Sequence, residues 1–282
     1  MIDRVKLLVV DGDSHSGSTA AILPPGFVTN PGENHISQNA VQAQLWLWWR
    51  ECLDTWLPSI LGSDPWDCIH MGDAVEGIHH WTTEIISPEP SDHGQAFLSL
   101  MRSDDPKAPG LLDLPNRQKF FAITGTEVHT RNTETSLAHM LGAERCPMSH
   151  KYSANQWRLE YNGQLCSFQH HCSATSRLWL ESGEFSRMLT QEQSACVRNS
   201  QRAPDIVVRA HRHRYGMFSD GQSMAIVSPA WQALTRHGHK AVVGEIPRVG
   251  MFALDWRDKE PGELPTVHPF LRAFPLPPEI TR

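Results

Sequence analysis

Short apolar runs recur along the chain, and most are bounded by glycine, proline or a charged residue. Runs of about four to eight apolar residues favour buried strands over amphipathic helices. Two further segments flank Asn162-Gly163, the strongest short signal for a β-hairpin. These patterns predict strands at residues 5–10, 66–71, 119–124, 157–161, 164–168, 206–208, 224–227 and 249–255.

Other stretches place their apolar residues at helical spacing. Helices are therefore expected at residues 38–57, 94–102, 134–141 and 184–198. The helices alternate with the first strands, and the hairpin-like strands come later. This order predicts an α/β fold with two sheets in a single domain spanning residues 1–282. Prolines and glycines mark 21–35 and 82–115 as loop insertions, and the tail from Pro275 is proline-rich.

Composition narrows the class of protein. The 282 residues are 40% hydrophobic and carry a formal charge of -6, which argues against binding duplex nucleic acid by charge alone. No apolar run approaches the ~20 residues that span a bilayer, and the start of the chain lacks a signal-peptide pattern. We therefore expect a cytoplasmic protein without a membrane segment. The six cysteines form no C-x-x-C pair and are expected to be free thiols.

Carboxylate and imidazole motifs follow the predicted strands in one order along the chain. With 16 histidines in the chain, chance alone produces an occasional D-x-H or H-x-H, so the positions at strand ends carry the prediction. Ends of several strands can assemble a two-metal hydrolytic site from such ligands. The motifs are Asp13-Ser14-His15, Gly72-Asp73, Gly125-Thr126-Glu127-Val128-His129, His170-His171 and His211-Arg212-His213.

Several neighbouring positions have two interpretations. Glu76 fits a supporting role behind a metal ligand or a place in the first turn of a helix. His79-His80 fits a substrate cleft or an ordinary loop. One of His170 and His171 is expected to bind metal, and His170 is favoured. A second H-x-H, at 237–239, lies in a polar stretch and is expected to be an exposed loop.

The third motif pairs a carboxylate with a histidine. Glu127 and His129 are two residues apart and share a face if the chain stays extended. A carboxylate ligand beside a histidine proton donor suits hydrolytic chemistry.

The ordered set resembles the calcineurin-like metallophosphoesterases, whose pattern runs D-x-H, G-D-x-x-D/E, G-N-H-D/E, a single histidine and G-H-x-H. The resemblance spans residues 5–230, with Gly72-Asp73-Ala74-Val75-Glu76 as its second block and Ala210-His211-Arg212-His213 as its last. It implies a four-layer α/β/β/α sandwich with two mixed sheets and metals at the strand ends. The third block departs from the family, and together with Gly77-Ile78-His79-His80 it looks most like bacteriophage-type members.

The resemblance also implies two divalent cations that share Asp73. One would be held by Asp13, His15, Asp73 and His213, and the other by Asp73, Glu127, His170 and His211. If Glu127 replaces the asparagine of the family, its negative charge favours a cation that prefers oxygen ligands. Mn²⁺ is then the first choice, with Mg²⁺, Zn²⁺ and iron as alternatives.

The implied activity is metal-dependent hydrolysis of phosphate esters. Asp73 would bridge the cations, His129 would protonate the leaving oxygen, and Glu76 would support the site. His80 and Arg131 would contact the substrate. The long loops favour a phosphodiester such as a nucleotide or a nucleic-acid end, with nuclease-like activity. A phosphomonoesterase, including a protein phosphatase, is the first alternative, and a non-catalytic metal-bound scaffold is the second. The sequence leaves a homodimer open.

Overall fold

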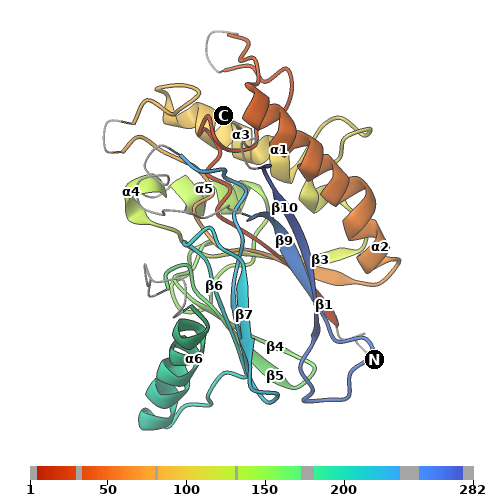
Figure 1. The fold of residues 1–282 in the computed structure, drawn as a ribbon, viewed down its shortest axis with the longest axis vertical. Helices are drawn as coiled ribbons and strands as arrows, with labels where there is room; N and C mark the ends of the chain where they lie inside the picture. Colours follow the sequence, from red (N-terminus) through yellow and green to blue (C-terminus); the bar gives the residue numbers. More distant parts are fainter. Residues whose placement is uncertain are drawn as a thin grey trace, which may run out of the picture.

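Two five-stranded sheets pack against each other, with helices on their outer faces (Figure 1). The structure is a computed structural model that describes residues 5–29, 34–79, 82–130, 133–172, 181–235 and 248–275. The four-layer α/β/β/α architecture with two mixed sheets, predicted from the sequence, is confirmed. Among the described helices, none combines the length and the apolar character needed to cross a bilayer.

The first sheet has the strand order β10-β9-β1-β2-β3. Its strands are β1 (Leu7–Asp11), β2 (Trp66–His70), β3 (Arg117–Ala122), β9 (Arg248–Asp255) and β10 (Thr266–Ala273). β1, β2 and β3 are parallel, β9 is antiparallel to β1, and β10 is antiparallel to β9. The three parallel strands therefore end at one edge, and the first three motifs follow them there.

The second sheet has the order β4-β5-β6-β8-β7. Its strands are β4 (Trp157–Tyr161), β5 (Gln164–Phe168), β6 (Ile206–Arg209), β7 (Gly216–Ser219) and β8 (Met224–Val227). β5, β6 and β8 are parallel, and the edge strands β4 and β7 are antiparallel to their neighbours. The sequence did not predict β7 and β10, because both lie at sheet edges and carry a mixed pattern of half-buried and exposed residues.

Residues of both sheets share the central core. Leu8 and Val10 of β1 meet Phe168 of β5 and Val208 of β6 between the sheets, whereas the alternate residues of β1 face the helices. A strand covered on both sides reads as a continuous apolar run, which is why β1 was visible in the sequence.

Helices cover the two outer faces. They are α1 (Ala40–Glu51), α2 (Leu57–Leu61), α3 (Pro90–Met101), α4 (Glu127–Thr130), α5 (Thr133–Met140) and α6 (Glu181–Arg198), with a π-helical turn at Cys52–Trp56 and a 3-10 turn at Leu111–Asp113. α1, α2, α3 and α5 pack on the first sheet, and α6 packs on the second (Figure 1). The four predicted helices are confirmed with shifted ends, and α4 was not predicted.

Candidate metal centre

The loops that follow β1 and β2 run side by side. The backbone N–H of Asp13 donates to the carbonyl of Gly72 at 2.9 Å, and that of His15 donates to the carbonyl of Asp73 at 2.9 Å. Parallel pairing of the two strands thus continues into their loops. This backbone contact fixes the first two motifs against each other.

Asp13, His15 and His213 form one group of ligand-type atoms that all lie within 4.8 Å of one another. His15 Nε2 lies 3.0 Å from His213 Nε2, and His213 Nε2 lies 4.0 Å from Asp13 Oδ1. The other ring nitrogen of His15 donates to Glu76 Oε2 at 2.9 Å. That bond orients the imidazole and directs the Nε2 lone pair toward the group.

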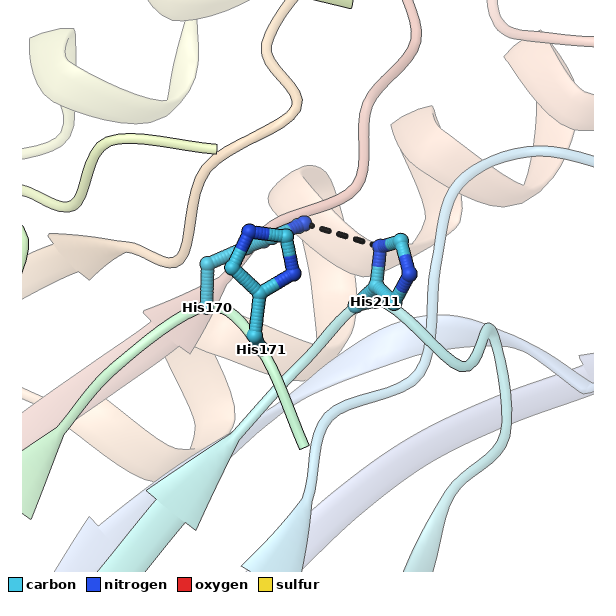
Figure 2. Close-up of side chains that lie close together, drawn as sticks. All are labelled: His170, His171 and His211. Atoms are coloured by element: carbon cyan, nitrogen blue, oxygen red, sulfur yellow. Dashed lines mark hydrogen bonds between the residues drawn. The ribbon is translucent and has the colours of Figure 1, made fainter. Parts of the chain in front are cut away.

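Asp13, Asp73 and His170 form a second, adjoining group. His170 Nδ1 donates to the carbonyl of Met71 at 2.8 Å, which leaves Nε2 to face Asp73 Oδ2 at 3.0 Å. The same nitrogen lies 3.2 Å from His211 Nδ1 (Figure 2).

His171 is exposed and lies at the margin of the centre. Its ring centroid is 4.9 Å from those of His170 and His211, so His171 also has a nitrogen within reach of a cation there. Of the two histidines, only His170 is buried against both aspartates.

The structure brings six of the seven predicted ligands together at the strand ends. They are Asp13, His15, Asp73, His170, His211 and His213. Glu127 is not among them. Its side chain is exposed and belongs to none of the metal-capable groups within the described part of the chain.

A helix explains why Glu127 points away. The prediction required an extended chain after β3, but α4 begins at Glu127. Thr126, one residue earlier, faces the centre instead: its backbone N–H donates to Asp73 Oδ1 at 2.6 Å, and its Oγ1 donates to Asp73 Oδ2 at 3.1 Å. Thr126 Oγ1 also lies 3.2 Å from both His170 Nε2 and His211 Nδ1. Sequence reasoning missed Thr126 because a threonine carries no metal-ligand signal.

Glu76 and His129 both contact His15, a member of the group formed by Asp13, His15 and His213. Glu76 is buried; its Oε2 also accepts from Gln232 Nε2 at 2.9 Å, and its Oε1 accepts from His79 Nε2 at 2.9 Å. His129 Nδ1 donates to the Glu76 carbonyl at 2.8 Å, and its ring lies 4.8 Å from that of His15. Gln232 was not predicted, since nothing in its local sequence marks it.

Three remaining predictions fall outside the described residues. They concern His80, Arg131 and the H-x-H at 237–239. The substrate contacts assigned to His80 and Arg131 therefore remain predictions.

The centre concentrates negative charge in a buried space. Burial raises the pKa of Asp13 to about 6, and the charge of Asp73 adds to this effect. Burial also raises the pKa of Asp73, but hydrogen bonds from His170 and His211 outweigh it and hold that pKa well below its usual range. Burial lowers the pKa of His15 and His170, yet the neighbouring carboxylates overcome it and raise both to about 9. The protein itself thus places positive charge between these acids.

Backbone strain is concentrated at the same residues. Among the described non-glycine residues with positive φ, five of nine belong to the centre: Asp13 at 46°, His15 at 41°, Asp73 at 50°, His211 at 73° and His213 at 53°. Such conformations cost free energy and persist where the surroundings enforce them, commonly at functional sites.

Glu134 of α5 joins two of the motif loops. It is buried, with Oε1 accepting from the N–H of Ala74 at 3.0 Å and Oε2 accepting from the N–H of Gly125 at 2.6 Å. Burial and the charge of Asp73 raise the pKa of Glu134 to about 7. The carboxylate therefore holds the second and third motifs in register, a role that the sequence did not reveal.

Replacing Glu134 with alanine is expected to lower the free energy of unfolding by about 2–5 kcal/mol, because two buried N–H donors lose their acceptor. Thermal or denaturant unfolding measures this change. Glu160→Ala is the matched control: Glu160 is exposed and pairs with exposed Arg202, so its loss is expected to cost less than about 1 kcal/mol. Equal stability of the two variants would show that Glu134 does not hold the loops.

Comparison with known proteins gives matches at the level of structure alone. No family model matches the chain, and no curated protein matches it. An archaeal phosphodiesterase is 11% identical with a TM-score of 0.43, covering 94% of this chain and 99% of its own. Vacuolar Protein Sorting 29 from Cryptosporidium parvum is 12% identical with a TM-score of 0.43, covering 96% and 99%. Vps29 of Entamoeba histolytica, solved with Zn²⁺, is 10% identical with a TM-score of 0.38, covering 95% and 98%.

The fold assignment rests on the chain's own geometry. The two mixed sheets, the helices on both outer faces and the convergence of the motif residues at the strand ends are the features implied by the resemblance. The protein therefore has the four-layer α/β/β/α fold that the resemblance to the calcineurin-like metallophosphoesterases implies.

Proposed function

We propose that this protein is a metal-dependent phosphoesterase that hydrolyses phosphodiesters with two divalent cations. The observation that carries the proposal is the convergence of two carboxylates and four imidazoles from four strand ends. Asp13, His15, Asp73 and His170 are buried, His213 is half-buried and His211 is exposed. Asp13, His15, Asp73 and His213 would hold one cation, and Asp73, His170 and His211 would hold the other. Asp73 would be shared.

The donor atoms fit cations. Asp13 Oδ1 is buried and accepts no hydrogen bond among the described residues. His15 and His170 each donate their Nδ1 proton to an acceptor outside the centre, so their Nε2 atoms present lone pairs toward other acceptors at 3.0 Å. Facing lone pairs in a buried site need a proton or a cation between them, and a divalent cation would replace the protons held there.

When bound, the cations would stabilise charge on the phosphoryl oxygens and lower the pKa of an attacking water. The side chains supply the geometry. Glu76 orients His15, the Met71 carbonyl orients His170, and Thr126 holds the Asp73 carboxylate. His129 donates a hydrogen bond from Nδ1 to the Glu76 carbonyl, so Nε2 is the nitrogen that would pass a proton to the leaving oxygen.

The position of Glu127 changes the expected metal. The sequence favours Mn²⁺ because Glu127 would add a third carboxylate to Asp13 and Asp73. With Glu127 exposed, the donor set is rich in imidazole, which suits Zn²⁺, Fe²⁺ and Mn²⁺ better than Mg²⁺.

A metal add-back assay tests the function. The protein is stripped with a chelator, reconstituted separately with Mn²⁺, Zn²⁺, Fe²⁺ or Mg²⁺, and assayed on bis-p-nitrophenyl phosphate and p-nitrophenyl phosphate. Hydrolysis of the diester is the expected result. A preference for the monoester would establish the phosphomonoesterase alternative. If the protein is inactive with every metal and on both esters, the non-catalytic metal-bound scaffold is the alternative that remains.

Thr126→Val and Glu127→Ala separate the two candidates in the third motif. Valine keeps the branched shape but removes the hydroxyl that faces Asp73, His170 and His211, so cation affinity is expected to fall about 10–100-fold. Glu127→Ala is expected to leave affinity unchanged because its side chain is exposed. Isothermal titration of the metal-free proteins measures both. A loss confined to Glu127→Ala would restore the original assignment.

A further inference from the structure

A groove of about 460 Å³ lies between α6 and the outer face of β4 and β5. His171 lines one part of it. The same residue lies against His170 and His211 at the margin of the candidate metal centre (Figure 2). The groove therefore adjoins the proposed site of hydrolysis.

Strand alternation explains why the groove is not filled. α6 covers the middle and far side of the second sheet, where Phe185, Met188 and Leu189 pack on residues of β6 and β8. Trp157 and Phe168 of β4 and β5 point into the inter-sheet core. Their neighbours therefore face outward, and these are polar: Arg158, Ser167 and Gln169. Ser167 is buried and donates to Glu192 of α6, whereas Arg158 and Gln169 are half-buried. The apolar face of α6 therefore leaves the side chains of Arg158 and Gln169 partly open to solvent.

The groove wall is rich in side-chain amides. Its amide residues are Gln156, Gln169, Gln191, Asn199 and Gln201. Gln156, Asn199 and Gln201 each make a side-chain hydrogen bond within the protein. In the described part of the chain the side chains of Gln169 and Gln191 make none, so their amides offer both donors and an acceptor, which is the pattern that pairs with the edges of nucleobases.

One positive charge of the groove remains uncompensated. Arg209 is buried in an ion pair with Glu192, so these two charges cancel. Arg158 is half-buried, and its guanidinium donates to the carbonyl of Arg202 and to Gln201 Oε1. No carboxylate lies within ion-pair distance of Arg158 in the described part of the chain. A guanidinium in this setting suits a phosphate group.

We propose that this groove binds the nucleotide that flanks the scissile phosphate of a single-stranded oligonucleotide, with amides contacting the base and Arg158 contacting the next phosphate. The inference rests on the proposed phosphodiesterase function and names its substrate class. The volume lies within the range of about 300–1,000 Å³ typical of small-molecule sites. From Met188 to Cys196 the helical wall extends about 12 Å, at about 1.5 Å per residue, which exceeds what a simple phosphomonoester needs.

Two substrates separate the groove from the metal centre. Bis-p-nitrophenyl phosphate engages only the centre, whereas the 5′-phosphorylated thymidine dinucleotide pTpT would also fill the groove. Arg158→Ala and Gln191→Ala are each expected to raise the KM for pTpT about fivefold, the loss of one hydrogen-bonded contact, and to leave the KM for bis-p-nitrophenyl phosphate unchanged. Gln118→Ala, at an exposed position on β3, is the matched control.

Binding without metal gives a second readout. Fluorescence anisotropy of labelled pTpT on the metal-free protein is expected to show the same fivefold weakening in both variants and none in Gln118→Ala. If both variants keep the wild-type KM and dissociation constant for pTpT, the groove does not bind the dinucleotide. That result would leave the phosphodiesterase proposal intact. Inactivity of the reconstituted wild type on both substrates would instead overturn the proposed function, and the anisotropy would still decide whether the groove binds the dinucleotide.

Discussion

Replacing Asp73 with asparagine is expected to lower diesterase activity by a factor on the order of 10³, because the shared carboxylate is lost while the loop is kept. Asparagine retains the shape of the side chain and an oxygen that can accept from the Thr126 N–H. The change therefore removes charge with little effect on the fold. Activity on bis-p-nitrophenyl phosphate and metal content by elemental analysis measure the two consequences.

Asp220→Asn is the control for the loss of one negative charge. Asp220 accepts hydrogen bonds from Gln222 and Ser223 in an exposed turn after β7, and among the described residues it belongs to none of the metal-capable groups. It is expected to keep full metal content and activity. Full activity of Asp73→Asn at normal metal content would contradict the shared-ligand role.

Gly125→Ala is expected to be the most damaging small substitution. A Cβ at position 125 would lie 2.2 Å from the backbone nitrogen of Asp73 and 2.3 Å from Asp73 Oδ1. On the opposite loop, Gly72 has φ of +96°, and a Cβ there would lie 2.7 Å from the Gly125 Cα. The two glycines thus let two strand-end turns touch, and a methyl group would separate them.

The expected cost is about 3 kcal/mol of unfolding free energy together with loss of cation binding, because the added atom meets backbone that cannot rotate away. Thermal unfolding and titration with the metal measure both effects. Gly183→Ala is the control: Gly183 lies in α6 with open space around it, so alanine is expected to be neutral or slightly stabilising. Normal metal binding by Gly125→Ala would show that the loops can separate without harm.

Some strands and site residues could be predicted from the sequence, and others could not. β1, β2 and β6 are short and buried, so their apolar runs were visible, and the motifs after them converge as predicted. β7 and β10 were not predicted because these two edge strands mix half-buried and exposed residues and carry no continuous apolar run. Gln232 and Glu134 contact the centre from distant positions in the chain, and no local pattern marks such contacts.

The third motif separates what the sequence determines from what the tertiary structure decides. The sequence by itself determined that a loop with polar residues follows β3 and meets the other motifs, because strand ends of one sheet share an edge. Which side chain enters the centre depends on where the next helix begins. Since α4 starts at Glu127, that residue turns to solvent and Thr126 contacts Asp73. The tertiary structure alone decided this, as it decided the partly open polar face beside α6, because both depend on how separate elements pack.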